Sequence, residues 1–334
     1  MKWYTNNANE SDIVLSTRVR LARNLKEYPF PAHLDRQARK NVNELVRDIL
    51  VSPNDKDLKY IEMSDLSSYQ AVSLAEKHLI SPDFASDNTG RALILSNEED
   101  VSIMLCEEDH VRIQVIYPGL SLDEAYEKAA EFDEKLNKSA EIAFDERIGY
   151  LTQCPTNLGT GMRASVMLHL PALGRSSAMS RLATTVAKLG LTLRGAYGEG
   201  SEPNGDIYQL SNQVTLGISE KSAIQNLQSI TEQIVTQERQ AREILLKDDK
   251  FIDKIWRAYG ILKNAHMISC SEFTDLISLV RLGASSGIIN VDNATLSRLL
   301  IEMQPATINA NADKAYTAAQ RDVIRASAIK QALV

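Results

Sequence analysis

The chain has 334 residues, enough for one large domain or two ordinary domains, each with a sizeable hydrophobic core. It is 44% apolar and 24% charged, and its net charge of -7 argues against direct nucleic-acid binding as the main role. No apolar run approaches the ~18 residues of a membrane span, and the polar residues 1–11 predict no signal peptide. We therefore expect no membrane association. The 3 cysteines are well separated, so we also expect no disulfide framework and a reducing cytoplasmic location.

An extended segment is predicted over residues 13–24. Arg18 and Arg20 are two positions apart, so both side chains point to the same face of a strand. Two like charges side by side are unfavourable unless an anion lies between them. The segment is therefore either a basic, solvated edge strand or part of an anion-binding site.

Helical spacing of apolar residues predicts helices over 35–50 and 65–80, the first of which we interpret as scaffold. The second ends at His78, which taken alone is typical of an ordinary surface or core histidine. Three strand-like runs follow at 92–95, 101–105 and 111–117. Their short connections predict an antiparallel meander.

The turn between the last two runs carries three consecutive acidic residues and a histidine, within Cys106–Arg112. Such a cluster could bind a metal ion or could simply be a solvated turn. Consecutive residues rarely converge on one ion, so we expect no direct metal site here.

A helix is predicted over 122–138, with Ser121 and Glu124 forming a capping box. After residue 219 the pattern is helical throughout, with runs at 224–234, 251–263, 272–282 and 293–303. The chain thus has a mixed first part and a helical last part.

One block reverses the charge of the chain locally. From Arg147 to Gly198 there is no Asp or Glu, but there are five arginines and a lysine. In a chain of net charge -7, this reversal suggests a concave site for a polyanion. Within the block, Cys154–Arg163 has the Pro and Gly content of a loop.

Three interpretations of this loop compete. Residues 159–164 satisfy the dinucleotide-binding pattern G-x-G-x-x-A, but the acidic residue expected about 20 positions later is absent. The loop could instead be a tight turn between a strand and a helix starting near Arg163, with Cys154 a buried small hydrophobe. In the third interpretation, arginines from several segments clamp phosphates while Cys154 faces a substrate.

Two further segments are chemically suggestive. Five glycines or prolines within 195–205 are typical of an active-site lid, with Arg194 and Glu199 at its first edge. Near the end of the chain, Arg321 and Arg325 would stack on one helix face with Asp322 beside them. That face is either an ordinary charged surface or a site for an anion.

Four of these segments resemble the motifs of the phosphagen kinases, the arginine and creatine kinase family, in the family's order. They are Ser16–Arg20, Cys106–Arg112 (with Cys106 in place of the family's Asn), Cys154–Thr160 and Arg194–Glu199. The resemblance covers about residues 13–220. It implies an α+β fold in which an antiparallel sheet is flanked by helices, followed here by a C-terminal helical domain.

The same resemblance implies roles for individual residues. The residues expected to bind ATP are Arg18, Arg20, His78, Arg112, Arg163 and Arg194. Glu108 and Glu199 would be catalytic carboxylates. Cys154, as a thiolate, would contact the acceptor guanidinium and would not act as a covalent nucleophile. Magnesium would be carried by ATP, with Glu107 as an indirect partner and no direct protein ligand.

These residue types suit phosphoryl transfer to a guanidinium. The reaction needs alignment and charge neutralisation, which arginine forks and Mg²⁺ supply without a P-loop. A guanidinium has a pKa above ~12 and is a poor nucleophile while charged. Two carboxylates can align its N–H groups, and one can remove a proton as attack proceeds.

The sequence also bears on the acceptor. Only 15 residues precede Ser16, so we expect the helical N-terminal domain of the small-guanidine kinases to be absent. The helical C-terminal part, with Arg-Asp-x-x-Arg-Ala at 321–326, resembles that of bacterial protein-arginine kinases. We therefore predict a catalytic domain over 1–220, a helical domain over 221–334, and phosphorylation of protein arginines. The alternatives are a kinase for free arginine or another small guanidine, and a non-catalytic phosphoarginine-binding adaptor.

The resemblance implies regulation and partners as well. Arg321, Asp322 and Arg325 would form an allosteric phosphoarginine site. The partners would be an activator (McsA), the repressor CtsR and the ClpC–ClpP protease in a stress response, and the chain could form a homodimer.

Overall fold

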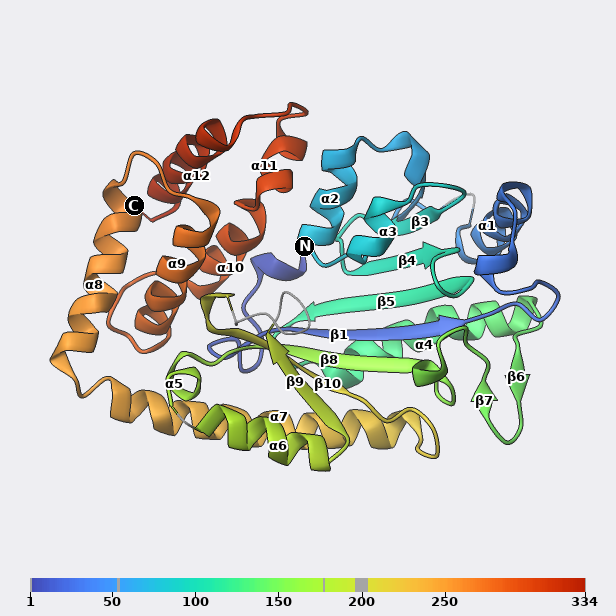
Figure 1. Cartoon of the computed structure of the whole chain (residues 1–334), viewed down its shortest axis with the longest axis horizontal. Coiled ribbons are helices and arrows are strands. Elements are labelled where there is room, and N and C mark those ends of the chain that lie inside the picture. The colour runs from blue at the N-terminus through green and yellow to red at the C-terminus, as the bar shows by residue number, and fades with distance from the viewer. Residues whose placement is uncertain (1, 53–54, 177, 196–203, 334) are drawn as a thin grey trace.

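The computed structural model describes residues 2–52, 55–176, 178–195 and 204–333. Its centre is an eight-stranded sheet in the order β2-β3-β4-β5-β1-β8-β10-β9, with all neighbouring strands antiparallel (Figure 1). The strands are β1 (Val14–Arg23), β2 (Leu58–Glu62), β3 (Ala92–Ser96), β4 (Val101–Leu105), β5 (Val111–Pro118), β8 (Met162–His169), β9 (Leu191–Gly195) and β10 (Ile207–Asn212). A small hairpin is formed by β6 (Phe144–Asp145) and β7 (Gly149–Tyr150).

Helices flank the sheet and make up the last third of the chain. In the first part they are α1 (Arg36–Leu50), α2 (Ser68–Glu76), α3 (Pro82–Ser86), α4 (Leu122–Ser139), α5 (Pro171–Gly174) and α6 (Ala178–Lys188). They continue as α7 (Glu220–Leu245), α8 (Asp249–Asn264), α9 (Cys270–Ser285), α10 (Asn293–Glu302), α11 (Pro305–Asn311) and α12 (Ala318–Ala332). The predicted α+β class, with a helical C-terminal part, is confirmed.

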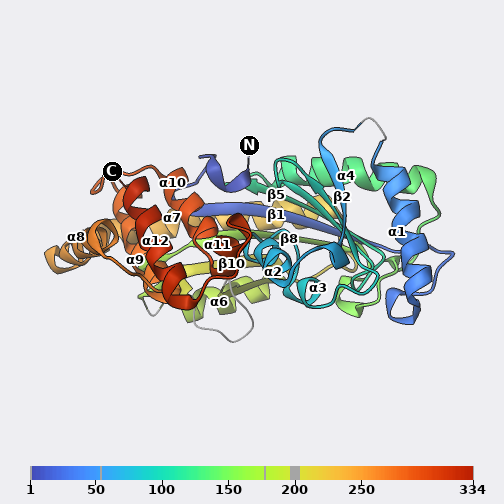
Figure 2. The same ribbon diagram turned by 90° about the horizontal axis from the view of Figure 1, so that it is seen from above.

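The two faces of the sheet differ in chemistry. In β1 the apolar residues Val19 and Leu21 enter the main core, against which α4 packs, while Arg18 and Arg20 lie on the other face. Figure 2 shows α4 on one side of the strands and α2 and α3 on the other. The polar face is therefore the one on which a site can form.

The structure excludes two alternatives that the sequence left open, and one prediction was wrong. Residues 13–24 form no edge strand, because β1 pairs with both β5 and β8. No helix starts near Arg163, since Met162–His169 is strand β8, paired on both sides. Ser121 makes no cap bond to α4; its hydroxyl donates to the Pro118 carbonyl instead, and its ψ of 52° lies outside the cap region.

Two hydrophobic cores meet at the join between the two parts. The first half of α7 packs into the core of the sheet through Ile224, Leu227 and Ile234. A second core collects buried residues of α8, α9, α10 and α12 together with one residue each from β1, β8 and β10. The predicted domain boundary at residue 220 stays a prediction, and we propose that the boundary lies between α7 and α8.

A buried polar network ties the two parts together. Arg242 of α7 donates to Glu238 at 2.8 Å and to the His169 carbonyl at 3.0 Å. The Glu238 carboxylate also accepts the N–H groups that open α5, and the His169 ring lies 2.9 Å from the hydroxyl of Ser278 in α9. Burial, followed by the nearby arginine, lowers the pKa of His169 well below its usual value.

Acid should destabilise this protein before its carboxylates titrate. Burial lowers the pKa of His78 to about 4 and lowers those of His110 and His169 from 6.5. In the unfolded chain these histidines bind protons near pH 6.5, whereas in the folded chain they stay neutral. The free energy of unfolding therefore decreases as pH falls from about 6.5 toward 4. We expect the melting temperature to fall between pH 7 and pH 5.

The substitution His169→Gln, which retains a donor for Ser278, should make this loss of stability shallower. The same substitution at the exposed His266 is the matched control and should leave the slope unchanged. A melting temperature that stays flat from pH 7 to pH 5 in the wild type would contradict the assignment.

Candidate active site

Neighbouring strands bring four arginines onto the polar face. Arg20 of β1 lies directly opposite Arg163 of β8. Arg112 of β5 lies opposite Ala22, one position along the same face of β1 from Arg20. Arg18 completes the group and donates to the Gln209 carboxamide of β10 at 2.8 Å. The strand register thus assembles the cluster that sequence motifs only suggested.

The cluster is electrostatically unfavourable without a ligand. Burial, and then Arg163 and Arg112, lower the pKa of Arg18 to about 10, and burial beside the same arginines lowers that of Arg20 well below its usual value. Guanidinium groups are held charged here at a free-energy cost that a bound anion would remove. The polar face is therefore built for a polyanion.

The acidic turn after β4 supplies two glutamates with different surroundings. Glu107 lies 2.6 Å from one guanidinium nitrogen of Arg112 and accepts a hydrogen bond from Ser81; its side chain is 7% exposed. Glu108 lies 2.9 Å from another nitrogen of Arg112 and is 37% exposed. The Glu107 carboxylate is thus occupied by protein partners, whereas the Glu108 carboxylate is accessible to a ligand.

The other two residues of this turn position the site rather than contact it. Asp109 accepts hydrogen bonds from the Asn24 side chain at 2.7 Å and from the Gln153 N–H at 2.9 Å. His110 accepts the Leu25 N–H at 3.0 Å. These bonds join the acidic turn to the end of β1 and to the segment leading into Cys154. No sequence pattern indicated these partners.

The loop that carries Cys154 packs against Thr215, which fixes its conformation. Gly159 has φ of 102°, and a Cβ there would lie 2.2 Å from the Thr215 carbonyl oxygen, so only glycine fits. The Thr215 hydroxyl lies 3.0 Å and 2.7 Å from the carbonyls of Thr156 and Leu158, respectively. Cys154 remains partly exposed, with its sulfur 3.0 Å from the Thr156 hydroxyl oxygen. The loop is a tight turn, but Cys154 is not a core residue.

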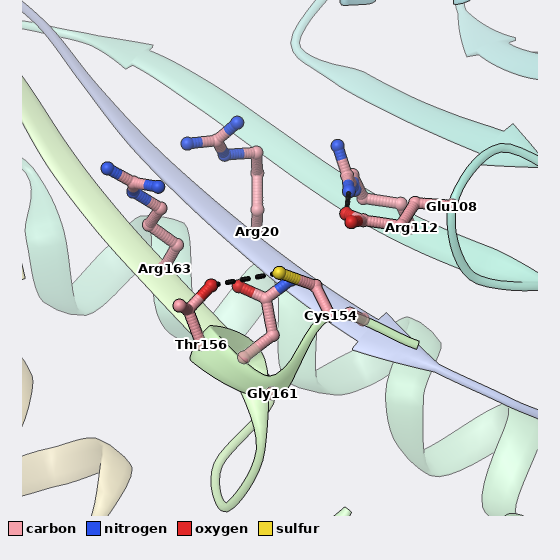
Figure 3. A pocket seen from close by; sticks show the side chains of 9 residues that line it. Arg20, Glu108, Arg112, Cys154, Thr156, Gly161 and Arg163 are labelled. Carbon is pink, nitrogen blue, oxygen red and sulfur yellow. Dashed lines mark hydrogen bonds and ion pairs between the residues drawn. The ribbon is translucent and has the colours of Figure 1, made fainter. Parts of the chain in front are cut away.

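A cavity of about 180 Å³ opens between these elements. Figure 3 shows Arg20 and Arg163 on one side of it, Glu108 and Arg112 on another, and Cys154 between them. Positive groups for a phosphate and an accessible carboxylate for a cation thus face the same small space. This combination fits a phosphate donor meeting a cationic acceptor.

A second cavity of about 550 Å³ adjoins the first, because both are lined by Arg20 and Arg112. Arg18, His78 and Gln209 also line it, together with apolar side chains such as Ile80 and Met104. Its volume and mixed lining suit a nucleotide whose phosphates reach the shared arginines.

His78 is placed in this cavity by an unusual backbone. It has φ of 61°, and the Gln114 side chain holds its carbonyl at 2.9 Å. Burial, and then Arg18, lower the pKa of its ring to about 4, so it is neutral at physiological pH. A neutral ring offers no charge to a phosphate.

The alternative sites considered from sequence fit less well. The glycines at 159 and 161 precede strand β8 and open no helix, so they cannot present a helix N-terminus to a dinucleotide. Among the described residues there is no group of three or more His, Cys, Asp or Glu placed to hold a metal ion. That magnesium is carried by ATP, with Glu107 as an indirect partner, stays a prediction.

A family model agrees with this chemistry. The model of the ATP:guanido phosphotransferase C-terminal catalytic domain matches residues 41–241, more than half of the chain. The chain belongs to the ATP:guanido phosphotransferase family. A second model, the protein-arginine kinase McsB C-terminal domain, matches residues 248–334. The gap between the two matches coincides with the passage from α7 to α8.

Curated relatives of this phosphotransferase match along its whole length. A protein-arginine kinase of Halothermothrix orenii is 46% identical over 334 residues, covering 99% of this chain and 96% of that protein. One of Clostridium acetobutylicum is 42% identical over 336 residues and covers 99% of both chains. The expected guanidino phosphotransferase activity class is thereby confirmed.

Solved structures of the family share the fold. Lombricine kinase gives a TM-score of 0.61 at 26% identity, covering 70% of this chain and 68% of that one. A duplicated taurocyamine kinase from Schistosoma mansoni, with bound transition state analog components, gives 0.60 at 28% identity. The match covers 68% of this phosphotransferase and 33% of the duplicated kinase.

Two predicted site residues of the phosphotransferase lie away from the cavities or outside the described residues. Arg194 is exposed on edge strand β9, opposite Gln209, and is absent from the described lining of both cavities. Glu199 lies outside the described residues. Their roles remain predictions.

The C-terminal motif differs from the expected charged surface. Arg325 is 1% exposed and donates to the carbonyls of Met303 at 2.9 Å and Ile268 at 2.7 Å. It also pairs with Asp322 at 2.6 Å. Of the two alternatives for this face, an ordinary charged surface does not fit Arg325, because Arg325 is a buried structural residue. Arg321 is partly exposed and donates to the Tyr316 carbonyl.

Among the described residues, no helix has both the length and the apolar character needed to cross a membrane.

Proposed function

We propose that this phosphotransferase transfers the γ-phosphate of ATP to arginine side chains of proteins. The observation that carries the proposal is that Arg20 and Arg112 line both cavities. A nucleotide in the larger cavity would present its terminal phosphate to the smaller one, where Glu108 and Cys154 lie. Donor and acceptor would then meet at the shared arginines.

The residues of the smaller cavity suit the two halves of the reaction. Arg20, Arg112 and Arg163 would bind the equatorial oxygens of the transferring phosphoryl group through their guanidinium forks. Glu108 would accept N–H bonds from the incoming guanidinium, align it and take the proton lost during attack, with Glu199 as the proposed second carboxylate. Cys154 would contact the same guanidinium. Bound Mg²⁺ would supply further neutralisation of phosphate charge.

The protein character of the acceptor is supported by the names of the relatives, which are protein-arginine kinases along the full chain. A kinase for free arginine or another small guanidine is the nearest alternative. An adaptor that binds phosphoarginine without catalysis is disfavoured by the accessible carboxylate of Glu108 beside the arginine cluster.

We extend this proposal to regulation and partners on the basis of family resemblance alone. We infer a cytoplasmic stress-response enzyme with McsA, CtsR and ClpC–ClpP as partners, and a homodimer. Arg321 and Asp322 remain the candidates for an allosteric phosphoarginine site, with Arg325 holding Asp322 in place.

The proposal is tested by incubating the purified protein with labelled ATP and Mg²⁺, together with either an unfolded protein or free arginine. Acid-labile, base-stable label on arginine of the protein is the expected result. Label on free arginine alone would establish the alternative kinase. Label on neither acceptor, in a preparation that binds ATP, would favour the adaptor.

A further inference from the structure

The C-terminal helical part contributes directly to the larger cavity. Gln304, at the junction of α10 and α11, lines this cavity together with Val72, Ala75 and Glu76 of α2. In Figures 1 and 2, α11 lies beside α2, and the two helices pack against each other. The nucleotide cavity is therefore walled by both parts of the chain.

Gln304 is held between two anchored positions. On one side, the Glu76 carboxylate accepts the N–H groups of Ala306 at 2.9 Å and Thr307 at 2.7 Å, which caps α11. On the other side, Arg325 donates to the carbonyl of Met303, the preceding residue. A side chain on so well-fixed a backbone can be used for recognition at little entropic cost.

The location of the phosphates indicates which part of the nucleotide Gln304 meets. Arg20 and Arg112, shared with the acceptor cavity, mark the phosphate end of the larger cavity. The nucleoside must then extend toward the remaining lining, which is mostly apolar and includes α2, α3 and Gln304. Its base needs a few polar partners there.

Most polar groups in that part of the cavity already have partners. Glu76 caps α11, and Ser81 donates to Glu107. The carboxamide of Gln304 donates one N–H to the Leu300 carbonyl at 2.9 Å, and its oxygen accepts a hydrogen bond from the Cys270 thiol at 3.5 Å. A carboxamide has two N–H donors and two lone pairs, so among the described residues Gln304 retains capacity for a ligand.

We propose that Gln304 is a base-contacting residue of the ATP site, supplied by the C-terminal helical part. A carboxamide can accept a hydrogen bond from the exocyclic amino group of adenine while donating to a ring nitrogen. Guanine carries a carbonyl oxygen at the corresponding position, so this contact favours ATP over GTP. The inference rests on the proposed function in taking ATP as the donor.

The test uses the full-length variant Gln304→Ala. We expect the Kd for a non-hydrolysable ATP analogue with Mg²⁺, measured by calorimetry without acceptor, to rise about tenfold. The KM for ATP should rise similarly while kcat at saturating ATP stays unchanged, and the preference for ATP over GTP should fall. An unchanged Kd in a variant that melts like the wild type would overturn the inference.

Cys270→Ala is the matched control. It removes the sulfur contact behind Gln304, but Cys270 does not belong to the described lining of the cavity. We expect its Kd and nucleotide preference to equal those of the wild type. If both variants weakened ATP and GTP equally, Gln304 would be a packing residue and the inference would fail. Failure of the proposed function is distinct, since it would appear as absence of arginine phosphorylation by the wild type.

Discussion

Replacing Arg20 with methionine is expected to weaken ATP binding by about a hundredfold while leaving the melting temperature without ligand unchanged or higher. Arg20 lines both cavities and lies opposite Arg163. Burial, and then the neighbouring arginines, lower its pKa well below the usual value. Removing this charge therefore relieves repulsion in the free protein but removes a phosphate ligand from the complex.

The measurement is the melting temperature with and without a non-hydrolysable ATP analogue and Mg²⁺. Ligand binding stabilises the folded state by mass action, so the wild type should melt higher with nucleotide and the variant should not. Arg147→Met, at an arginine whose side chain is 90% exposed, is the matched control and should retain the full shift. A variant that melts far lower without ligand, yet keeps its nucleotide shift, would make Arg20 a structural residue.

Substituting Glu108 with glutamine should lower kcat by about a hundredfold or more with little change in ATP affinity. Glutamine keeps an oxygen for Arg112 but cannot take a proton or offer a full negative charge to the acceptor guanidinium. Arg112 stays in place because Glu107 pairs with another of its nitrogens at 2.6 Å. The loss is therefore expected in the chemical step.

Steady-state kinetics with an unfolded protein substrate, combined with calorimetry for nucleotide binding, separates the two effects. The exposed Glu124→Gln on α4 provides a control that changes net charge equally. Near-normal turnover by a folded Glu108→Gln variant would remove Glu108 from catalysis and leave Glu199 as the candidate base.

The sequence determined those features that depend on local chemistry and periodicity. A side-chain period of two put Arg18 and Arg20 on one face before any partner strand was known, and helical spacing located α1, α4 and α7 to α10. The loop residues 154–160 indicated the family because they resemble one of its motifs. The capping box predicted at Ser121 failed because the Ser121 backbone, with ψ of 52°, lies outside the cap region; its hydroxyl accepts no N–H of α4 and donates to the Pro118 carbonyl.

Only the tertiary structure decided which residues cooperate. Register across β5, β1 and β8 brings Arg112, Arg20 and Arg163 together, and no local pattern encodes that register. The same holds for burial: the sequence pattern left the face of Arg325 as either a charged surface or an anion site, but packing of α12 buried Arg325 against the carbonyls of Met303 and Ile268. Gln304 reaches the larger cavity because α11 docks on α2, a contact between residues more than two hundred positions apart. Such long-range contacts depend on how the whole chain fills its hydrophobic cores, and a single segment carries no record of them.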